Sequence, residues 1–65
     1  MDNLVFVIKD AGKLVHYAAD EILSVNAELE SVTVNLKERT FKHSVSLYRE
    51  ILGYMTRREF NKLVK

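Results

Sequence analysis

The chain has 65 residues, of which 48% are hydrophobic, and it contains no cysteine. This composition excludes a disordered chain, a disulfide framework and a thiol-based metal site. The longest apolar run, residues 4–8, is far too short to cross a bilayer, and no basic-then-apolar leader precedes it. We therefore expect a single domain over residues 1–65, in a soluble, cytoplasmic protein with no membrane partner.

The net charge of +1 is unevenly distributed along the chain. Residues 1–55 hold six bases and eight acids, whereas residues 56–65 hold four bases and one acid. A protein that binds nucleic acid over its whole surface is usually strongly basic, because phosphate neutralisation supplies most of its affinity. Any contact with nucleic acid is therefore expected to be local.

The chain opens with a strong strand signal. Residues 4–8 are β-branched, aromatic or leucine and do not alternate with polar residues, which predicts a strand buried on both faces. Gly12 follows and supplies the positive φ that a short hairpin loop requires. Residues 14–19 return as a second strand, after which Asp20 either caps a single helical turn or marks a corner.

The next two segments alternate between apolar and polar residues. In residues 22–29 one predicted face carries Leu23, Val25, Ala27 and Leu29. In residues 31–37 the predicted inward face carries Val32, Val34 and Leu36, with Thr33 and Asn35 outward. A polar turn at residues 37–39 precedes a short strand at residues 40–43. The pattern predicts a meander of four or five antiparallel strands.

A helical period then replaces the alternation. Ser46 is the predicted N-cap of a helix whose apolar stripe comprises Leu47, Tyr48, Ile51, Leu52 and Met55. Gly53 is expected to mark the end of this helix, because glycine inside a helix costs about 1 kcal/mol relative to alanine.

A second helix is predicted to start at Thr56. Thr56 and Glu59 form a T-x-x-E capping box, and Met55 and Phe60 stand where a hydrophobic staple would stand. Phe60, Leu63 and Val64 share one face, which we expect to be buried on the sheet. The predicted fold class is therefore α+β: a small antiparallel β-meander of four or five strands, followed by two short C-terminal helices packed on one face.

The residue types that carry catalysis are poorly represented. The only glycines are Gly12 and Gly53, so no glycine-rich phosphate loop is present. His16 and His43 lie on predicted strands with no serine or carboxylate at a recognisable spacing. The two histidines could meet across strands, yet a closed zinc site needs four ligands. We expect no enzyme, no catalytic residue, no metal site and no cofactor.

Two charged groups are the candidate binding residues. The basic group comprises Arg57, Arg58, Lys62 and Lys65. It is either a solvated helix face or a surface that contacts phosphates or an acidic partner. The acidic group comprises Asp20, Glu21, Glu28 and Glu30. Asp20 and Glu21 are typical of a corner or cap, and Glu28 and Glu30 flank a predicted turn; alternatively, they form an anionic tip that docks on a basic protein surface.

The order of the segments resembles a known family. Residues 4–13 with 19–27, and residues 32–36 leading to 46–52, resemble the first half of a LytTR DNA-binding domain. The resemblance covers about residues 4–55 and implies a β-rich transcription regulator that inserts loops into successive major grooves. The family's second half is missing, and the loop at residues 27–30 is acidic where DNA would repel it. Only the topology of the first half is therefore carried over, and no DNA-contacting residue.

These observations lead to two functional hypotheses. The leading one is a small non-enzymatic regulatory protein, linked to transcription, that contacts nucleic acid through the basic C-terminal helix, as a homodimer that doubles its basic patch. The alternative is a protein–protein interaction module, or a phage-type inhibitor of a host protein, that binds through the acidic hairpin tip or an exposed sheet edge.

Overall fold

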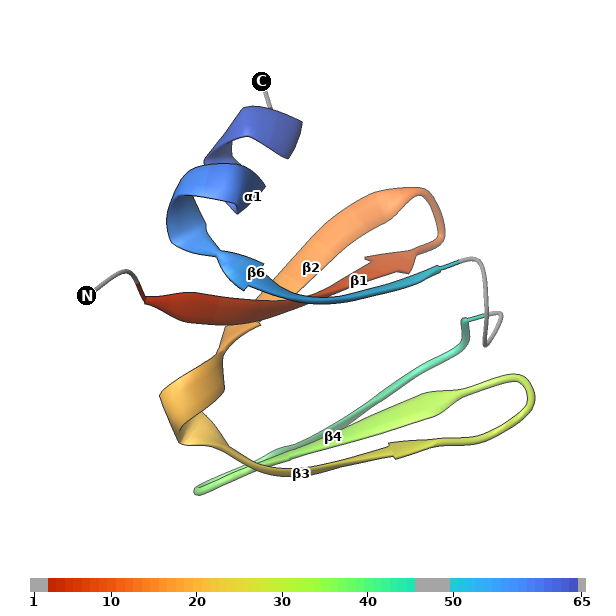
Figure 1. Cartoon of the computed structure of the whole chain (residues 1–65). Helices are drawn as coiled ribbons and strands as arrows, with labels where there is room; N and C mark the ends of the chain where they lie inside the picture. The colour runs from red at the N-terminus through yellow and green to blue at the C-terminus, as the bar shows by residue number, and fades with distance from the viewer. Residues whose placement is uncertain (1–2, 46–49, 65) are drawn as a thin grey trace.

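The protein forms two small antiparallel sheets and one α-helix (Figure 1), as seen in a computed structural model that describes residues 3–45 and 50–64. The elements in chain order are β1 (Leu4–Asp10), β2 (Lys13–Ala18), the 3-10 helix η1 (Ala19–Glu21), β3 (Ile22–Ala27), β4 (Val32–Leu36), β5 (Thr40–His43), β6 (Ile51–Thr56) and α1 (Arg57–Leu63). The sheets have the strand orders β2-β1-β6 and β3-β4-β5.

The first hairpin forms where the sequence predicts it. Strands β1 and β2 pair antiparallel, with Phe6 opposite Tyr17 and Asp10 opposite Lys13. The two loop residues, Ala11 and Gly12, have φ values of 53° and 83°. Two positive φ values define the type I′ turn, whose twist matches that of the flanking strands. The predicted role of Gly12 is confirmed.

The first predicted C-terminal helix is wrong over residues 51–55, which belong to strand β6. This strand pairs with the free edge of β1, with Leu4 opposite Thr56 and Ile8 opposite Ile51. The register shifts between Val7 and Ile8, and Gly53 on the opposite strand has a φ of 86°. Such a φ does not fit a helix interior but suits a β-bulge. Ser46, Leu47 and Tyr48 lie outside the described residues.

The predicted meander is divided between two sheets. The turn η1 carries the chain from β2 to β3, and strands β3, β4 and β5 then form the second sheet by themselves. The alternation predicted for β4 is confirmed, since Val32 and Val34 are fully buried. In β3 the prediction is wrong for Leu23, which is 66% exposed, because a register shift between Ile22 and Ser24 interrupts the alternation.

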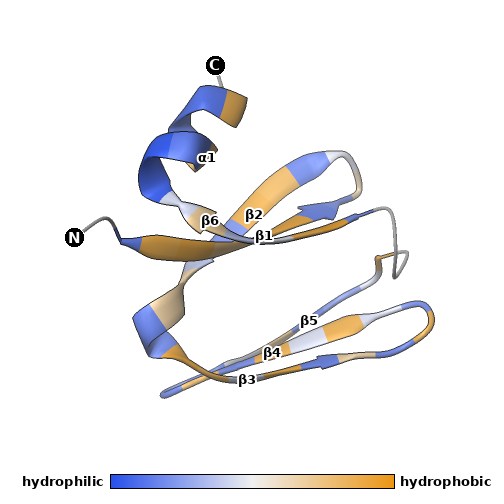
Figure 2. Cartoon of the chain, viewed as in Figure 1, coloured by the Kyte–Doolittle hydropathy of each residue, from blue (hydrophilic) through white to orange (hydrophobic). Residues whose placement is uncertain are grey.

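The molecule has three layers, and β1 lies at the centre. Phe6 and Ile8 pack against the second sheet, in a core with Val32, Val34 and Val45. Val5 and Val7, which point to the opposite face of β1, pack against Phe60 of α1. Figure 2 shows the hydrophobic β1 strand between the helix and the second sheet. This arrangement confirms the predicted burial on both faces for residues 5–8, whereas the prediction is wrong for Leu4, which is 49% exposed at the start of the strand.

The second predicted helix is confirmed as α1, but its burial is smaller than predicted. Phe60 is 6% exposed, whereas Leu63 and Val64 are 51% and 53% exposed. The helix has only seven residues and rises away from the sheet towards the C-terminus (Figure 1). Only its first part therefore reaches the sheet, and the predicted burial of Leu63 and Val64 is wrong.

Candidate functional site

The start of α1 is held by reciprocal hydrogen bonds between Thr56 and Glu59. The Glu59 amide donates to the Thr56 hydroxyl at 3.1 Å, and the Thr56 amide donates to the Glu59 carboxylate at 3.1 Å. The Thr56 hydroxyl also donates to the Glu59 carboxylate, at 3.0 Å. The bond from the Thr56 backbone amide, and then that from its hydroxyl, lower the pKa of Glu59, and the nearby Lys62 adds to the effect. The predicted capping box is therefore present, and it fixes where the basic helix begins.

Three of the four predicted basic residues lie on the outer surface of this helix. Arg57, Arg58 and Lys62 are exposed, and Lys65 lies outside the described residues. Arg58 and Lys62 are four positions apart and therefore share one helix face. The amide of Arg57 donates to the carbonyl of Asn3 at 2.9 Å, which joins the start of the helix to the start of β1.

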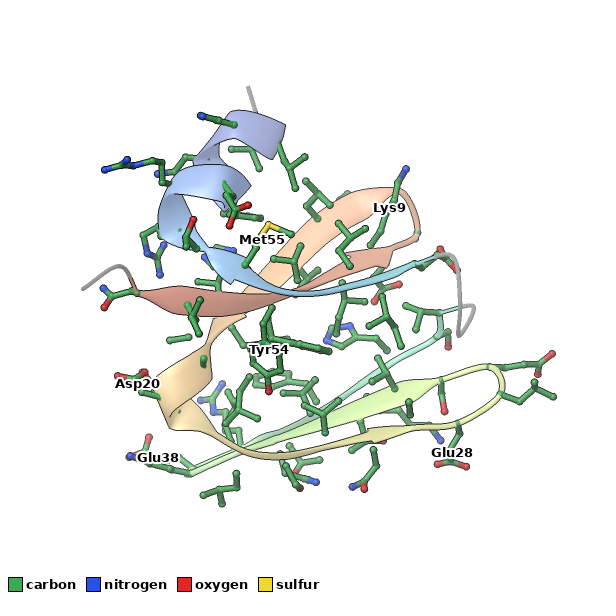
Figure 3. All side chains as sticks on the ribbon, viewed as in Figure 1. Lys9, Asp20, Glu28, Glu38, Tyr54 and Met55 are labelled. Carbon is green, nitrogen blue, oxygen red and sulfur yellow. The ribbon has the colours of Figure 1, made fainter. Side chains whose placement is uncertain are left out.

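Charge separates between the two halves of the molecule. Residues 3–18 and 50–64, which form the first sheet and α1, hold five bases and three acids. Residues 19–45, which form η1 and the second sheet, hold three bases and five acids. Lys9 alternates with Val7 and so belongs to the helix side of its sheet, while Asp20, Glu28 and Glu38 lie at the second sheet (Figure 3). The half of the molecule that contains the first sheet and α1 is therefore more basic than the half that contains η1 and the second sheet.

The four predicted acidic residues form two separate groups. Asp20 and Glu21 belong to η1, which precedes β3, and Glu28 and Glu30 belong to the loop that follows it. A six-residue strand is about 20 Å long. Figure 3 shows Asp20 and Glu28 at opposite ends of the second sheet. One compact partner can engage one group or the other but not both at short range.

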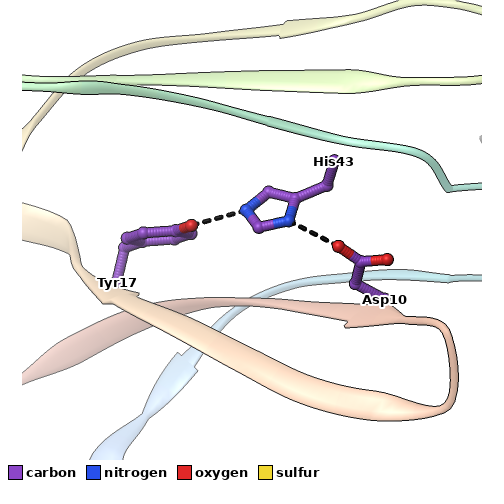
Figure 4. Close-up of polar contacts among 3 residues, drawn as sticks. All are labelled: Asp10, Tyr17 and His43. Carbon is purple, nitrogen blue, oxygen red and sulfur yellow. Dashed lines mark hydrogen bonds and ion pairs between the residues drawn. The ribbon is translucent and has the colours of Figure 1, made fainter.

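A polar cluster that the sequence did not reveal joins the two sheets (Figure 4). The Nδ1 atom of His43 lies 2.7 Å from Oδ2 of Asp10, and its Nε2 atom lies 2.5 Å from the Tyr17 hydroxyl. The His43 side chain is 12% exposed and that of Asp10 is 31% exposed. Burial, and then the negative charge of Asp10, raise the pKa of Tyr17. The cluster thus links β5 to β1 and β2.

The order carboxylate–imidazole–hydroxyl resembles that of a nucleophilic triad, with a phenol in the place of an aliphatic hydroxyl. The raised pKa of Tyr17 disfavours the phenolate form, and the phenol can donate a hydrogen bond to a neutral His43. The Tyr17 ring also packs beside Phe41, with ring centroids 5.5 Å apart. The sequence contained one usable signal, since hairpin pairing places Asp10 and Tyr17 on the same face of the sheet.

The two histidines do not converge. His16 pairs with Val7 on the helix side of the first sheet, and its ring lies 4.4 Å from that of Phe60. His43 lies between the sheets. Within residues 3–45 and 50–64, no group of three or more histidines and carboxylates is arranged to hold a metal ion.

Comparison of the chain with protein-family models, with curated proteins and with solved structures gives no match. The resemblance to LytTR domains therefore remains a prediction from sequence. Among the described residues, no helix combines the length and the apolar character that a membrane span requires.

Proposed function

We propose that the protein is a small, non-enzymatic regulatory protein that contacts nucleic acid through the outer face of α1. The observation that supports this proposal is the separation of charge between the two halves. Exposed bases on the helix belong to a half with two more bases than acids, and the second sheet has two more acids than bases. An approaching polyanion is attracted to the helix side and repelled by the opposite side.

The proposed contact is electrostatic. Arg57, Arg58, Lys62 and Lys65 would lie against backbone phosphates, where basic side chains position a protein without reading base sequence. Phe60 anchors the helix to the first sheet, so the side chains of Arg57, Arg58 and Lys62 start from an anchored helix. Because few charges are involved, we expect weak binding, and because the contact is electrostatic, the binding should weaken further as the salt concentration rises.

Fluorescence anisotropy with a labelled mixed-sequence DNA duplex, and with single-stranded RNA, tests the proposal. The parent should bind at low salt, and the logarithm of its binding constant should fall linearly with the logarithm of salt concentration. The double variant Arg58→Ala/Lys62→Ala should bind more weakly to all sequences. For this variant, the slope of the logarithm of the binding constant against the logarithm of the salt concentration should become shallower by about one for each phosphate that is no longer neutralised.

The matched control is Lys37→Ala/Arg39→Ala, which removes the same charge from the turn between β4 and β5. This variant should bind like the parent. A parent that shows no salt-sensitive binding to either nucleic acid, or a control that loses as much affinity as the helix variant, would contradict the proposal.

A second function is favoured by the loop between β3 and β4. Leu29 is 77% exposed and stands between Glu28 and Glu30. The amide of Glu28 donates to the carbonyl of Ser31 at 2.7 Å, which closes the loop and holds Leu29 outward. An exposed leucine between two carboxylates is suited to a basic, partly apolar surface on another protein.

This alternative predicts a saturable complex with one host protein in a pull-down. The complex should be lost in Leu29→Ser and in Glu28→Lys/Glu30→Lys, and retained in Glu38→Lys, which changes an acid at the opposite end of the sheet. Equal capture by the parent and the loop variants would remove this alternative.

A further inference from the structure

A shallow groove lies at the end of the molecule where α1 begins. Leu4, Ala18 and Ala19 supply its apolar lining, with Arg57 on one side and Asp20 and Glu21 on another. It is built by the start of β1, the end of β2, η1 and the first residue of α1. The bond from the Arg57 amide to the Asn3 carbonyl fixes one of its sides. The groove is thus bordered by four secondary-structure elements and carries charges of both signs.

These charges are not neutralised locally. Within the part of the chain that the structure describes, no ion pair of 4.0 Å or less joins Arg57 to Asp20 or Glu21. All three residues are exposed. An apolar lining between a guanidinium and two carboxylates can therefore receive a surface that carries the complementary charges.

The apolar lining continues along the neighbouring strand. Leu4 and Tyr54 lie on the same face of their sheet as Phe6, because Tyr54 pairs with Phe6 and Leu4 is two residues away from it. That face is turned towards the second sheet, yet Leu4 and Tyr54 remain 49% and 55% exposed. Tyr54 points from β6 towards the space between the sheets (Figure 3). The second sheet therefore leaves this margin uncovered.

We propose that the groove and the Leu4–Tyr54 margin bind a second copy of this chain in a two-fold symmetric dimer. In such a dimer the same patch serves both subunits, so each residue contacts its complement on the other copy. A charged patch of this kind is self-complementary only when it contains both charge signs. This one does, since Arg57 of each copy can pair with Asp20 and Glu21 of the other, while Leu4 and Tyr54 exclude water.

The other exposed charged surfaces do not meet this condition. Arg58 and Lys62 present two positive charges on one helix face and would repel the same face of another copy. The loop at Glu28 and Glu30 would repel itself in the same way. The proposal does not rest on the proposed function. Arg57 belongs to both, but Asp20 and Glu21 take no part in the proposed nucleic-acid contact, and Arg58 and Lys62 lie outside the groove lining.

Sedimentation equilibrium over a wide range of protein concentration, combined with charge reversal, tests the dimer. The parent should dissociate from dimer to monomer on dilution. Arg57→Glu and Asp20→Arg/Glu21→Arg should each raise the dimer dissociation constant by about tenfold or more, because like charges then face each other. The variant that combines all three reversals should regain much of the parent's affinity.

Recovery of the dimer in the combined variant shows that the separate reversals did not merely unfold the chain, because further charge reversals would not restore a chain that cannot fold. Arg58→Glu is the matched control. It should leave the solution mass from sedimentation equilibrium the same as that of the parent, while it weakens binding of the DNA duplex. A parent that is monomeric at every concentration overturns the proposal, and so do reversals that leave the dimer intact. Reversals that change only the thermal stability of a monomer also overturn it, since Arg57 then pairs within its own chain.

Discussion

The imidazole of His43 lies 2.7 Å from the carboxylate of Asp10, and this contact joins the last strand of the second sheet to the end of β1. The other ring nitrogen contacts Tyr17 of β2, so one side chain bridges β5 to both strands of the first hairpin. In neutral His43 the Nδ1–H donates to Asp10 and Nε2 accepts from the Tyr17 hydroxyl. In the protonated ring both nitrogens donate, and the tyrosine oxygen can accept. The bridge thus tolerates either charge state of the histidine.

His43→Ala should destabilise the protein by about 1–3 kcal/mol, because it leaves the partly buried Asp10 and Tyr17 without their partner. Urea unfolding of the single variants and of His43→Ala/Asp10→Asn gives the coupling energy between the two residues, which we expect to be about 1 kcal/mol. His16→Ala combined with Asp10→Asn should be additive, since His16 lies on the opposite face of the sheet. Additivity in both pairs would show that the bridge contributes nothing.

Ionisation of the Tyr17 phenol should lower the free energy of unfolding at alkaline pH. Its pKa in the folded state lies above the unfolded value of 10.0, so the folded state resists ionisation. The corresponding stabilisation is fully present below pH 10 and is lost as pH rises through the folded value. Thermal unfolding measured across this window should show a steeper decline for the parent than for Tyr17→Phe. Tyr54→Phe, which alters an exposed tyrosine, is the control and should behave like the parent.

Ala11→Asn should stabilise the first hairpin. Ala11 has a φ of 53°, and a non-glycine residue in this region costs about 1–2 kcal/mol. Asparagine tolerates it better and creates the Asn-Gly pair that type I′ turns prefer. We expect a gain of about 0.5–1 kcal/mol in the free energy of unfolding, seen as a higher Tm. Gly12→Ala, at a φ of 83°, should have the opposite effect; a lower Tm for Ala11→Asn would contradict the turn assignment.

Phe60 should account for most of the anchoring of α1. Phe60→Ala removes a side chain that is 6% exposed and should cost about 3–5 kcal/mol, enough to threaten the fold. Leu63→Ala, at 51% exposed, should change stability by less than about 1 kcal/mol. Chemical denaturation of the two variants compares them directly. Similar losses of stability would mean that Leu63 is also buried.

The cap of α1 should make the helix sensitive to acid. Thr56→Ala should cost about 1 kcal/mol, because one amide at the helix start loses its acceptor. The pKa of Glu59 is lowered in the folded state, so the cap's contribution is present above the ordinary value of 4.5 and is lost as pH falls through the folded value. Circular dichroism during acid titration should show this loss in the parent and a flatter response in Thr56→Ala. Identical titration curves for the two proteins would contradict a stabilising role of the cap.

Signals that depend on neighbouring residues were readable from the sequence. The turn at Gly12, the alternation of β4 and the capping box at Thr56 each need only a few adjacent residues, because the turn, pleat or cap forms within the segment. The uninterrupted apolar run of β1 also predicted burial on both faces correctly for residues 5–8, though not for Leu4. Exposure of Arg57, Arg58 and Lys62 follows from the same local helix.

Whether residues 51–55 form a helix or a strand was decided by tertiary structure. Their apolar residues fit a helix stripe, but β1 has a free edge, and pairing with it satisfies backbone groups that are distant in sequence. The same non-local pairing placed His43 against Asp10 and Tyr17, and Arg57 beside the groove that Asp20 and Glu21 also line. Local sequence therefore determined the turns, the cap and the central strand. Only the stacking of two sheets decided which charged and polar side chains meet, because those contacts join residues that no local pattern relates.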